Sequence, residues 1–376
     1  MRNFVMTSGA SGIGHPDKLC DQISDAMVDA CLAADPRARM VAECALASDV
    51  LFLSLRTDRE PAFDPAALAR RVFDAAGYGG PARRAPTVML DLVIAGAAEA
   101  GDRPRAQNMV TAIGHACTHT PQALAYPVWA AHRLTRSLDG LRQTGAAPWL
   151  GPDLQAQVAV EFHDRRPVRV SAIAVTAGLA DPVTAGDVTA FLRRDVVEPA
   201  LSGGAAAIDA ATRIVFLRAP DGGGPAAHTG LTGRKSAEDG YGGFARQSSA
   251  ALSGKDPSRI DRTAAYAARQ IARCVVAAGL AAECEVQMSY LLGDEGPASV
   301  EIDSFGSGRL PDPVLGDRVR ALFDLGVAGI ARRMALGGLP AARGGRFFRD
   351  LATYGHMGRD DLSPPWEDTR PAADLA

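Results

Sequence analysis

The sequence predicts an α+β fold with two or three domains. Pairs of segments with alternating apolar residues are followed by helical segments three times, whereas a doubly wound sheet alternates single strands with helices. The chain has 376 residues, which is enough for several hydrophobic cores. Hydrophobic residues make up 47% of the chain and charged residues 22%, as in ordinary globular proteins.

The expected elements begin with a helix at Pro16, because proline favours the first helical turn and apolar residues follow at helical spacing to Ala34. Alternating runs at 40–46 and 50–55 then predict a hairpin. Further helices are expected at 64–77, 120–142, 187–201 and 261–280. Further strands are expected at 87–95, 158–162, 168–175, 212–217, 283–291 and 298–305. Residues 219–256 are rich in glycine and serine, and a loop of that length in a compact protein is usually functional.

The charge and the cysteine content exclude several classes of protein. The net charge of −3 gives no reason to expect a nucleic-acid or membrane partner, and no stretch approaches the roughly 20 apolar residues of a membrane span. The six cysteines form no C-x-x-C pair, so neither a zinc site nor a redox dithiol is expected. The amino terminus lacks the apolar run of a signal peptide. We therefore expect a cytoplasmic protein with reduced, buried thiols.

Lysine usage points to the candidate site. Of the 40 basic side chains only three are lysine, at Lys18, Lys235 and Lys255. A lysine that persists in such an arginine-biased chain indicates a position that needs a compact ammonium rather than a planar guanidinium. All three lie in polar motifs, so we interpret them as functional rather than as chance surface residues.

The first motif, Gly14-His-Pro-Asp-Lys18, lies at the amino terminus of the first expected helix. Free backbone N–H groups and the helix dipole favour an anion there. Lys18 adds positive charge, Asp17 is a candidate Mg²⁺ ligand, and His15 is a candidate donor to an oxyanion. The alternative is an ordinary capped helix with solvated charges.

The glycine-rich segment supplies a second set of charged groups. Arg234 and Lys235 adjoin a flexible loop, Lys255 follows a glycine, and Asp261 begins the next helix. Several cations together with separated aspartates are what a polyphosphate and its Mg²⁺ ions require. The chain has no G-x-x-x-x-G-K-[ST] motif, so an ordinary P-loop nucleoside triphosphatase is not expected.

Two other interpretations fail on context. The glycines at 9–14 resemble the dinucleotide fingerprint of short-chain dehydrogenases, but no tyrosine has a lysine four residues later and hairpins replace βαβ units. His115 and His119 lie four residues apart, as a metal pair on a helix would, but no third ligand accompanies them. We expect this histidine pair to be structural.

Together these motifs resemble the S-adenosylmethionine synthetase family, and the similarity runs from Thr7 to Trp366. Further shared segments are Asp21-Gln-Ile-Ser-Asp25, Ala131-His-Arg-Leu134, Pro148-Trp-Leu150, Thr263-Ala-Ala-Tyr-Ala-Ala-Arg269, Val276-Ala-Ala-Gly-Leu280 and Tyr354-Gly-His356. The resemblance implies three similar α+β domains around a pseudo-threefold axis, which we expect at 1–98, 106–222 and 223–376 with strands exchanged between them. It also implies a homodimer or a dimer of dimers, with active sites between two subunits.

The resemblance also implies a role for each matching residue. His15 would stabilise the triphosphate leaving group as sulfur attacks C5′ of the nucleotide. Mg²⁺ would be bound by Asp17 and Asp261, and K⁺ with the help of Glu43. The groups implied to hold the polyphosphate are Arg234, Lys235 and Lys255, and Lys18 is expected to be a further catalytic residue. The groups implied to bind nucleotide or acceptor are Asp153 near the ribose, Gln155, Asn108, Arg56, His228, Asp239 and Arg259.

Several positions depart from the family pattern. A glutamate and an aspartate that the family places at the methionine ammonium align with Arg56 and His228. Asn108 replaces an aspartate, and Gln155 replaces a lysine on the phosphate side. Two acids have thus been exchanged for basic residues while most polyphosphate groups remain, so we expect an acceptor site that disfavours a free amine.

The sequence therefore predicts a transferase that cleaves triphosphate from ATP or another nucleoside triphosphate and joins the 5′-deoxynucleoside to a sulfur nucleophile. L-methionine or a more anionic analogue is the expected acceptor, and S-adenosylmethionine or a related sulfonium the expected product. One alternative is a tripolyphosphatase or nucleotide hydrolase. Another is a non-catalytic partner subunit of a complete synthetase, against which the three retained lysines argue.

Overall fold

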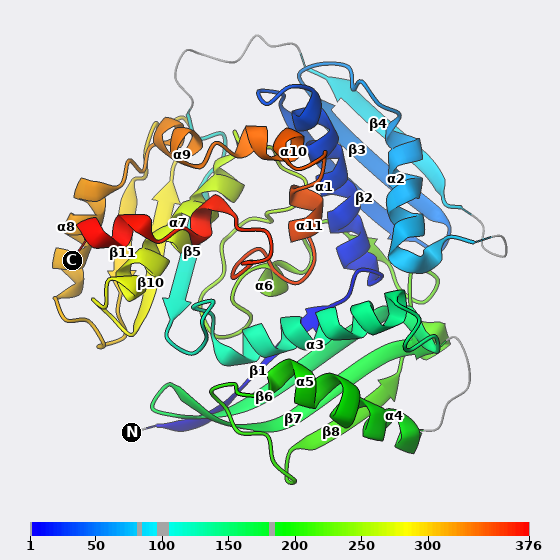
Figure 1. Ribbon diagram of the computed structural model, residues 1–376. Helices are drawn as coiled ribbons and strands as arrows, with labels where there is room; N and C mark the ends of the chain where they lie inside the picture. Colours follow the sequence, from blue (N-terminus) through cyan, green and yellow to red (C-terminus); the bar gives the residue numbers. More distant parts are fainter. Residues whose placement is uncertain (1, 81–84, 96–104, 180–184, 376) are drawn as a thin grey trace.

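Three β-sheets stand around a set of central helices (Figure 1). The computed structural model describes residues 2–80, 85–95, 105–179 and 185–375. Helices α1 (Pro16–Ala34), α3 (Tyr126–Gln143) and α7 (Ile260–Ala277) each pack on a different sheet. The architecture is α+β, as the sequence predicted.

The first sheet has the strand order β4-β3-β2-β9. Its strands are β2 (Met40–Ala47), β3 (Val50–Thr57), β4 (Thr87–Ile94) and β9 (Gly230–Leu231). Buried and open residues alternate along β2 and β3, because α1 and α2 (Pro65–Phe73) cover only one face. The uncovered face carries exposed apolar side chains, among them Phe52 (45% exposed) and Met89 (56%).

The second sheet has the strand order β1-β6-β7-β8. Its strands are β1 (Asn3–Ser11), β6 (Leu150–His163), β7 (Arg166–Leu179) and β8 (Arg213–Arg218). Helix α3 packs on β6, and α4 (Ala185–Phe191) and α5 (Glu198–Leu201) complete a separate hydrophobic core. Since Ser11 pairs with Gln155, the end of β1 and the loop after it lie beside β6.

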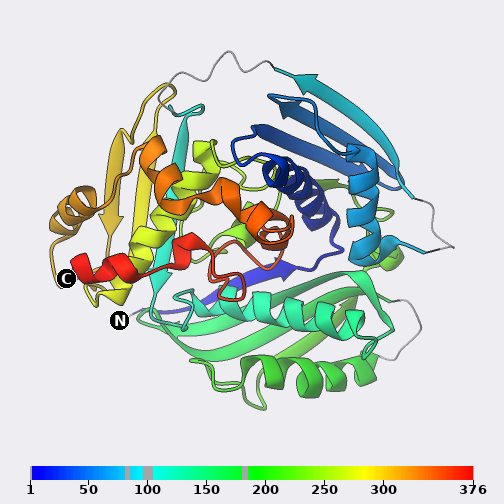
Figure 2. The same cartoon turned by 45° about the horizontal axis from the view of Figure 1, so that its top comes forward.

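The third sheet has the strand order β11-β10-β5. Its strands are β5 (Val110–Cys117), β10 (Glu283–Tyr290) and β11 (Ser299–Asp303). Helix α7 lies so close to β5 that a Cβ atom on Gly114 would be 2.0 Å from the carbonyl carbon of Ala268. The remaining helices are α6 (Ser236–Asp239), α8 (Asp312–Leu322), α9 (Val327–Met334), α10 (Leu339–Ala342) and α11 (Phe348–Leu351). Figure 2 shows α10 and the carboxy-terminal segment running back across the middle of the molecule.

Two strands and the start of one helix are among the differences from the expected elements. Strands β1 and β5 were not expected from the sequence. Helix α3 begins at Tyr126 rather than at residue 120, because the Thr120 hydroxyl instead closes a turn, accepting from Leu124 N and donating to Leu124 O at 3.0 Å each.

The six cysteines are free and buried, as expected. Within the described ranges, no helix is both long enough and apolar enough to cross a bilayer.

Candidate functional site

The amino terminus of α1 is held against β6. His15 is the N-cap residue, and its Nδ1 accepts a hydrogen bond from the backbone N–H of Asp17 at 3.2 Å. Pro16 occupies the first turn, where its missing N–H costs nothing. A Cβ atom on Gly14 would lie 2.3 Å from the carbonyl oxygen of Pro152, so only glycine allows this approach. The contact brings His15 next to Asp153.

Asp17 ties the helix to the glycine-rich segment. Its carboxylate is buried, and Oδ1 accepts from the backbone N–H of Leu231 at 3.0 Å and lies 2.8 Å from Nε of Arg234. Lys235 follows, with its ammonium 3.5 Å from Glu238, which also accepts from Ser11. The Arg234 side chain is 45% exposed and that of Lys235 is 24% exposed. Both cations therefore remain available to an anion from solvent.

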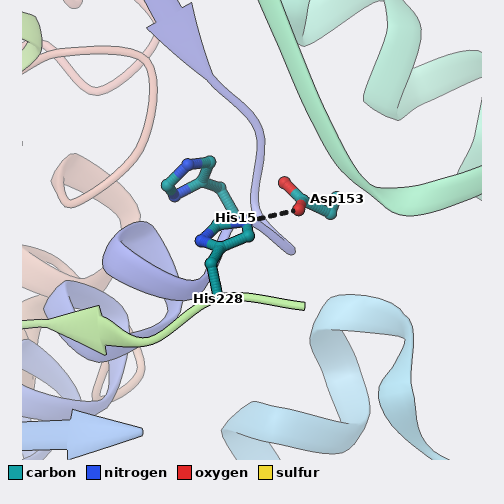
Figure 3. A group of neighbouring side chains, drawn as sticks. All are labelled: His15, Asp153 and His228. Atoms are coloured by element: carbon teal, nitrogen blue, oxygen red, sulfur yellow. Dashed lines mark hydrogen bonds and ion pairs between the residues drawn. The ribbon is translucent and has the colours of Figure 1, made fainter. Parts of the chain in front are cut away.

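His15, Asp153 and His228 form a compact group (Figure 3). Nε2 of His228 lies 2.9 Å from Oδ2 of Asp153, which also accepts from the backbone N–H of Gly224 at 2.7 Å. The two imidazole rings are 5.1 Å apart between centroids. The other oxygen of Asp153, Oδ1, is buried and has no hydrogen-bond partner among the described residues.

The protonation of His15 follows from its surroundings. Burial lowers the pKa of His15 to about 2, and the nearby charges of Lys235, Lys18 and Arg234 act in the same direction. The imidazole is therefore neutral at pH 7. Because Nδ1 accepts from Asp17, the proton lies on Nε2, which is a donor. A neutral donor surrounded by cations suits a developing oxyanion.

Lys18 and Asp239 form a buried ion pair. The Lys18 ammonium is 1% exposed and donates to Asp21 at 2.8 Å and to Asp239, which is itself fully buried. Burial alone would lower the pKa of Lys18, but the two carboxylates raise it above its ordinary value. Both groups are buried and paired in this structure, so their role toward a substrate stays a prediction. The charge on Lys18 still contributes to lowering the pKa of His15.

A second group lies around Asp261. Its Oδ1 accepts from Nδ2 of Asn108 at 2.8 Å and from the Lys255 ammonium at 3.1 Å. The backbone of Lys255 bridges to Val41 on β2, whereas Leu231, beside Asp17, pairs with Ala45 of the same strand. Four residues along a strand span roughly 13 Å. One chain thus keeps the Asp17 and Asp261 groups at separate points along the edge of β2.

Arg56 and His228 are each matched by a carboxylate. Arg56 lies on the uncovered face of the first sheet, with Nη1 2.8 Å from Oδ2 of Asp91. The hydrogen bond from Arg56 lowers the pKa of Asp91, and Ser54 also donates to it, at 3.2 Å. His228 is matched by Asp153. The excess of positive charge that we expected at Arg56 and His228 is therefore not found. Each side chain lies beside a carboxylate, and the sequence alone did not indicate these two pairings.

The other predicted residues flank these groups. Gln155 is half-buried on β6, two residues after Asp153. Arg259 is the N-cap residue of α7, and Glu43 is exposed on the uncovered face of the first sheet. His115 is buried and lies 2.9 Å from Glu283, as a structural histidine would, although it is on β5 rather than on a helix. Asp91 was missed, although a lone acid in an apolar strand was a visible signal.

The chain is similar to known proteins along nearly its whole length. Three family models match, described as the N-terminal (residues 3–90), central (103–222) and C-terminal (222–368) domains of S-adenosylmethionine synthetase. The S-adenosylmethionine synthase of Trichormus variabilis is 37% identical over 401 residues, covering 98% of this chain and 95% of that protein. The S-adenosylmethionine synthase of Gloeobacter violaceus is 39% identical over 411 residues, covering 100% of this chain and 98% of that protein. The chain belongs to the S-adenosylmethionine synthetase family and is an enzyme of the synthetase type.

Proposed function

We propose that the chain cleaves triphosphate from ATP and transfers the 5′-deoxyadenosyl group to a sulfur nucleophile. The observation that carries this proposal is the neutral His15, whose Nε2–H is a fixed donor at the amino terminus of α1 beside Arg234 and Lys235. Negative charge gathers on the leaving triphosphate when the C5′–O5′ bond breaks. A fixed donor, two cations and a helix terminus all stabilise that charge.

The ribose would bind at Asp153. Its Oδ2 is held by Gly224 and His228, so the carboxylate has a fixed orientation. Its buried Oδ1 lacks a partner in the described structure, and a ribose hydroxyl is the kind of donor that would satisfy it. Gln155, two residues along β6, would lie toward the phosphates.

Mg²⁺ would bind through Asp17 and Asp261. Mg²⁺ is commonly held by one or two carboxylates together with substrate phosphates, and each of these aspartates has one oxygen already engaged by a cation or amide. The donor set therefore fits an ion that is completed by the triphosphate. When bound, Mg²⁺ would neutralise the polyphosphate charge. Glu43 would contribute to K⁺ binding.

The active site would be shared between two copies of the chain. The Asp17 and Asp261 groups lie apart in one chain, and the first sheet leaves Phe52 and Met89 exposed on its uncovered face. Packing of two such faces about a twofold axis would bury this apolar surface and bring the Asp261 group of one chain to the Asp17 group of the other. We also propose a cytoplasmic location, since six free buried thiols suit a reducing compartment.

The shared site predicts a dimer in sedimentation equilibrium at micromolar concentration. Phe52→Glu should weaken the dimer, because a carboxylate would be buried against apolar surface. Val168→Glu is the matched control, since Val168 is 50% exposed on a different sheet. An active monomer would contradict the shared site.

The transferase proposal is tested by incubation with ATP, Mg²⁺ and L-methionine, followed by mass spectrometry. A nucleoside-sulfonium adduct together with tri- or diphosphate and phosphate is the expected result. Phosphate release with no adduct would instead indicate a nucleotide hydrolase or tripolyphosphatase. If neither ATP nor the acceptor is consumed, the chain would be a non-catalytic subunit.

A further inference from the structure

His228 and Asp153 are arranged as a base and its orienting acid. An ionised carboxylate can only accept hydrogen bonds, so the 2.9 Å contact with Oδ2 of Asp153 places the His228 proton on Nε2. The lone pair then lies on Nδ1, on the side of the ring away from Asp153 (Figure 3). Asp153 is itself fixed by Gly224 N at 2.7 Å, and the His228 side chain is 38% exposed. The dyad therefore holds an oriented lone pair on a partly exposed ring.

The two neighbouring histidines present different free nitrogens. Both rings carry the proton on Nε2, but the protein engages Nδ1 of His15 and Nε2–H of His228, which leaves a donor on His15 and an acceptor on His228. Their rings are 5.1 Å apart between centroids. One imidazole is thus suited to the leaving group and the other to a proton on the attacking group.

The same three side chains also offer ligand atoms within 4.8 Å of one another, a spacing that admits a metal ion. A metal would have to replace the contact of His228 with Asp153. Coordination through the protonated Nε2 of His15 would also move a proton onto Nδ1, against the Asp17 N–H. We therefore assign the group to proton transfer.

We propose that the His228–Asp153 dyad is a general base that lets this chain use a thiol as the sulfur nucleophile. A thioether such as methionine carries no proton on sulfur and needs no base. With a thiol, the S–C5′ bond forms and the C5′–O5′ bond breaks, and triphosphate leaves with that electron pair. The S–H proton passes to Nδ1 of His228 and then to solvent. The product is a neutral 5′-thioether of adenosine. This inference rests on the proposed adenosyl transfer and names its acceptor class.

The expected size of the effect follows from thiol ionisation. A thiol with an ordinary pKa near 8.5 is only about 3% thiolate at pH 7, so complete deprotonation in the site is worth roughly 30-fold. Near pH 9.5 the thiol is largely ionised in solution, and the contribution of a base should fall to a few-fold at most. A residue with a merely structural role would not show this dependence on pH.

The test compares L-homocysteine with L-methionine, a thiol and a thioether that differ by one methyl group. The measured quantity is the ratio of kcat/KM for the two acceptors at pH 7 and pH 9.5, with products identified by mass spectrometry. His228→Gln keeps a donor for Asp153 but offers no base. It should lower the thiol-to-thioether ratio roughly 30-fold at pH 7 and much less at pH 9.5. His163→Gln is the matched control on an exposed hairpin and should leave the ratio unchanged.

Transfer to methionine but not to homocysteine would overturn the inference and leave the proposed function intact. An equal ratio in wild type and His228→Gln at pH 7 would do the same. Absence of any adduct with both acceptors would overturn the proposed function, and the inference with it.

Discussion

Complementation between two inactive variants tests whether the site is shared. Asp17→Asn removes the carboxylate that lies 2.8 Å from Arg234, and Lys255→Met removes the ammonium that lies 3.1 Å from Asp261. Each variant alone should lose roughly a hundredfold or more in kcat, because each removes charge compensation at the polyphosphate. In one chain the two groups lie at different points along β2, so each site of a dimer would take one group from each chain.

The ATP turnover expected from the mixture of the two variants follows from how their chains pair. In a mixed dimer one site carries both changes and the other carries neither. Random assortment makes half of the dimers mixed, so the mixture should show about a quarter of wild-type activity. The assay is co-expression of the two variants with different affinity tags, followed by ATP turnover of the purified mixture. Activity no higher than that of the separate variants would refute the shared site.

Three further predictions concern stability, each measured by urea unfolding. Arg262→Met should cost about 3–5 kcal/mol, because it leaves the buried Asp25 carboxylate unpaired, whereas the exposed Arg320→Met should cost less than about 1 kcal/mol. Burial lowers the pKa of His132 to about 3, so its neutral form is favoured in the fold and its contribution is lost as pH falls below about 6.5. Between pH 7 and pH 5 the wild type should lose about 2 kcal/mol more than His132→Gln, and an equal loss would contradict this. Gly114→Ala should cost about 1–3 kcal/mol or more, since its Cβ would overlap Ala268, and an unchanged midpoint would contradict this packing.

Local signals predicted much of the fold. Pro16 and the apolar spacing after it defined α1 correctly, since both features act within the helix itself. Strand β5 was missed because Val110–Cys117 is mostly buried on both faces and shows no alternation. Thr120-Pro121 has the sequence of a helix start, but the turn onto Leu124 is more local and delays the helix to Tyr126.

In the candidate site, too, local geometry could be predicted from the sequence and contacts between distant segments could not. His15 and Asp17 could be assigned from the motif at one helix terminus, because that geometry is local. The burial of Lys18 against Asp239 depends on a contact between residues 221 positions apart. The pairing of Arg56 with Asp91 depends on the parallel register of β3 and β4. Non-local pairings of this kind decide which charges reach solvent, and the sequence pattern does not contain them.

The most direct test of the account is which bond of ATP breaks. ATP carrying oxygen-18 in the bridge between C5′ and the α-phosphorus would be turned over with each sulfur acceptor, and the products analysed by mass spectrometry. Attack at C5′ opposite a triphosphate held by His15, Arg234 and Lys235 predicts that all of the label leaves in the polyphosphate or phosphate. Label that stays with the nucleoside would mean that a P–O bond is cleaved, and would contradict adenosyl transfer.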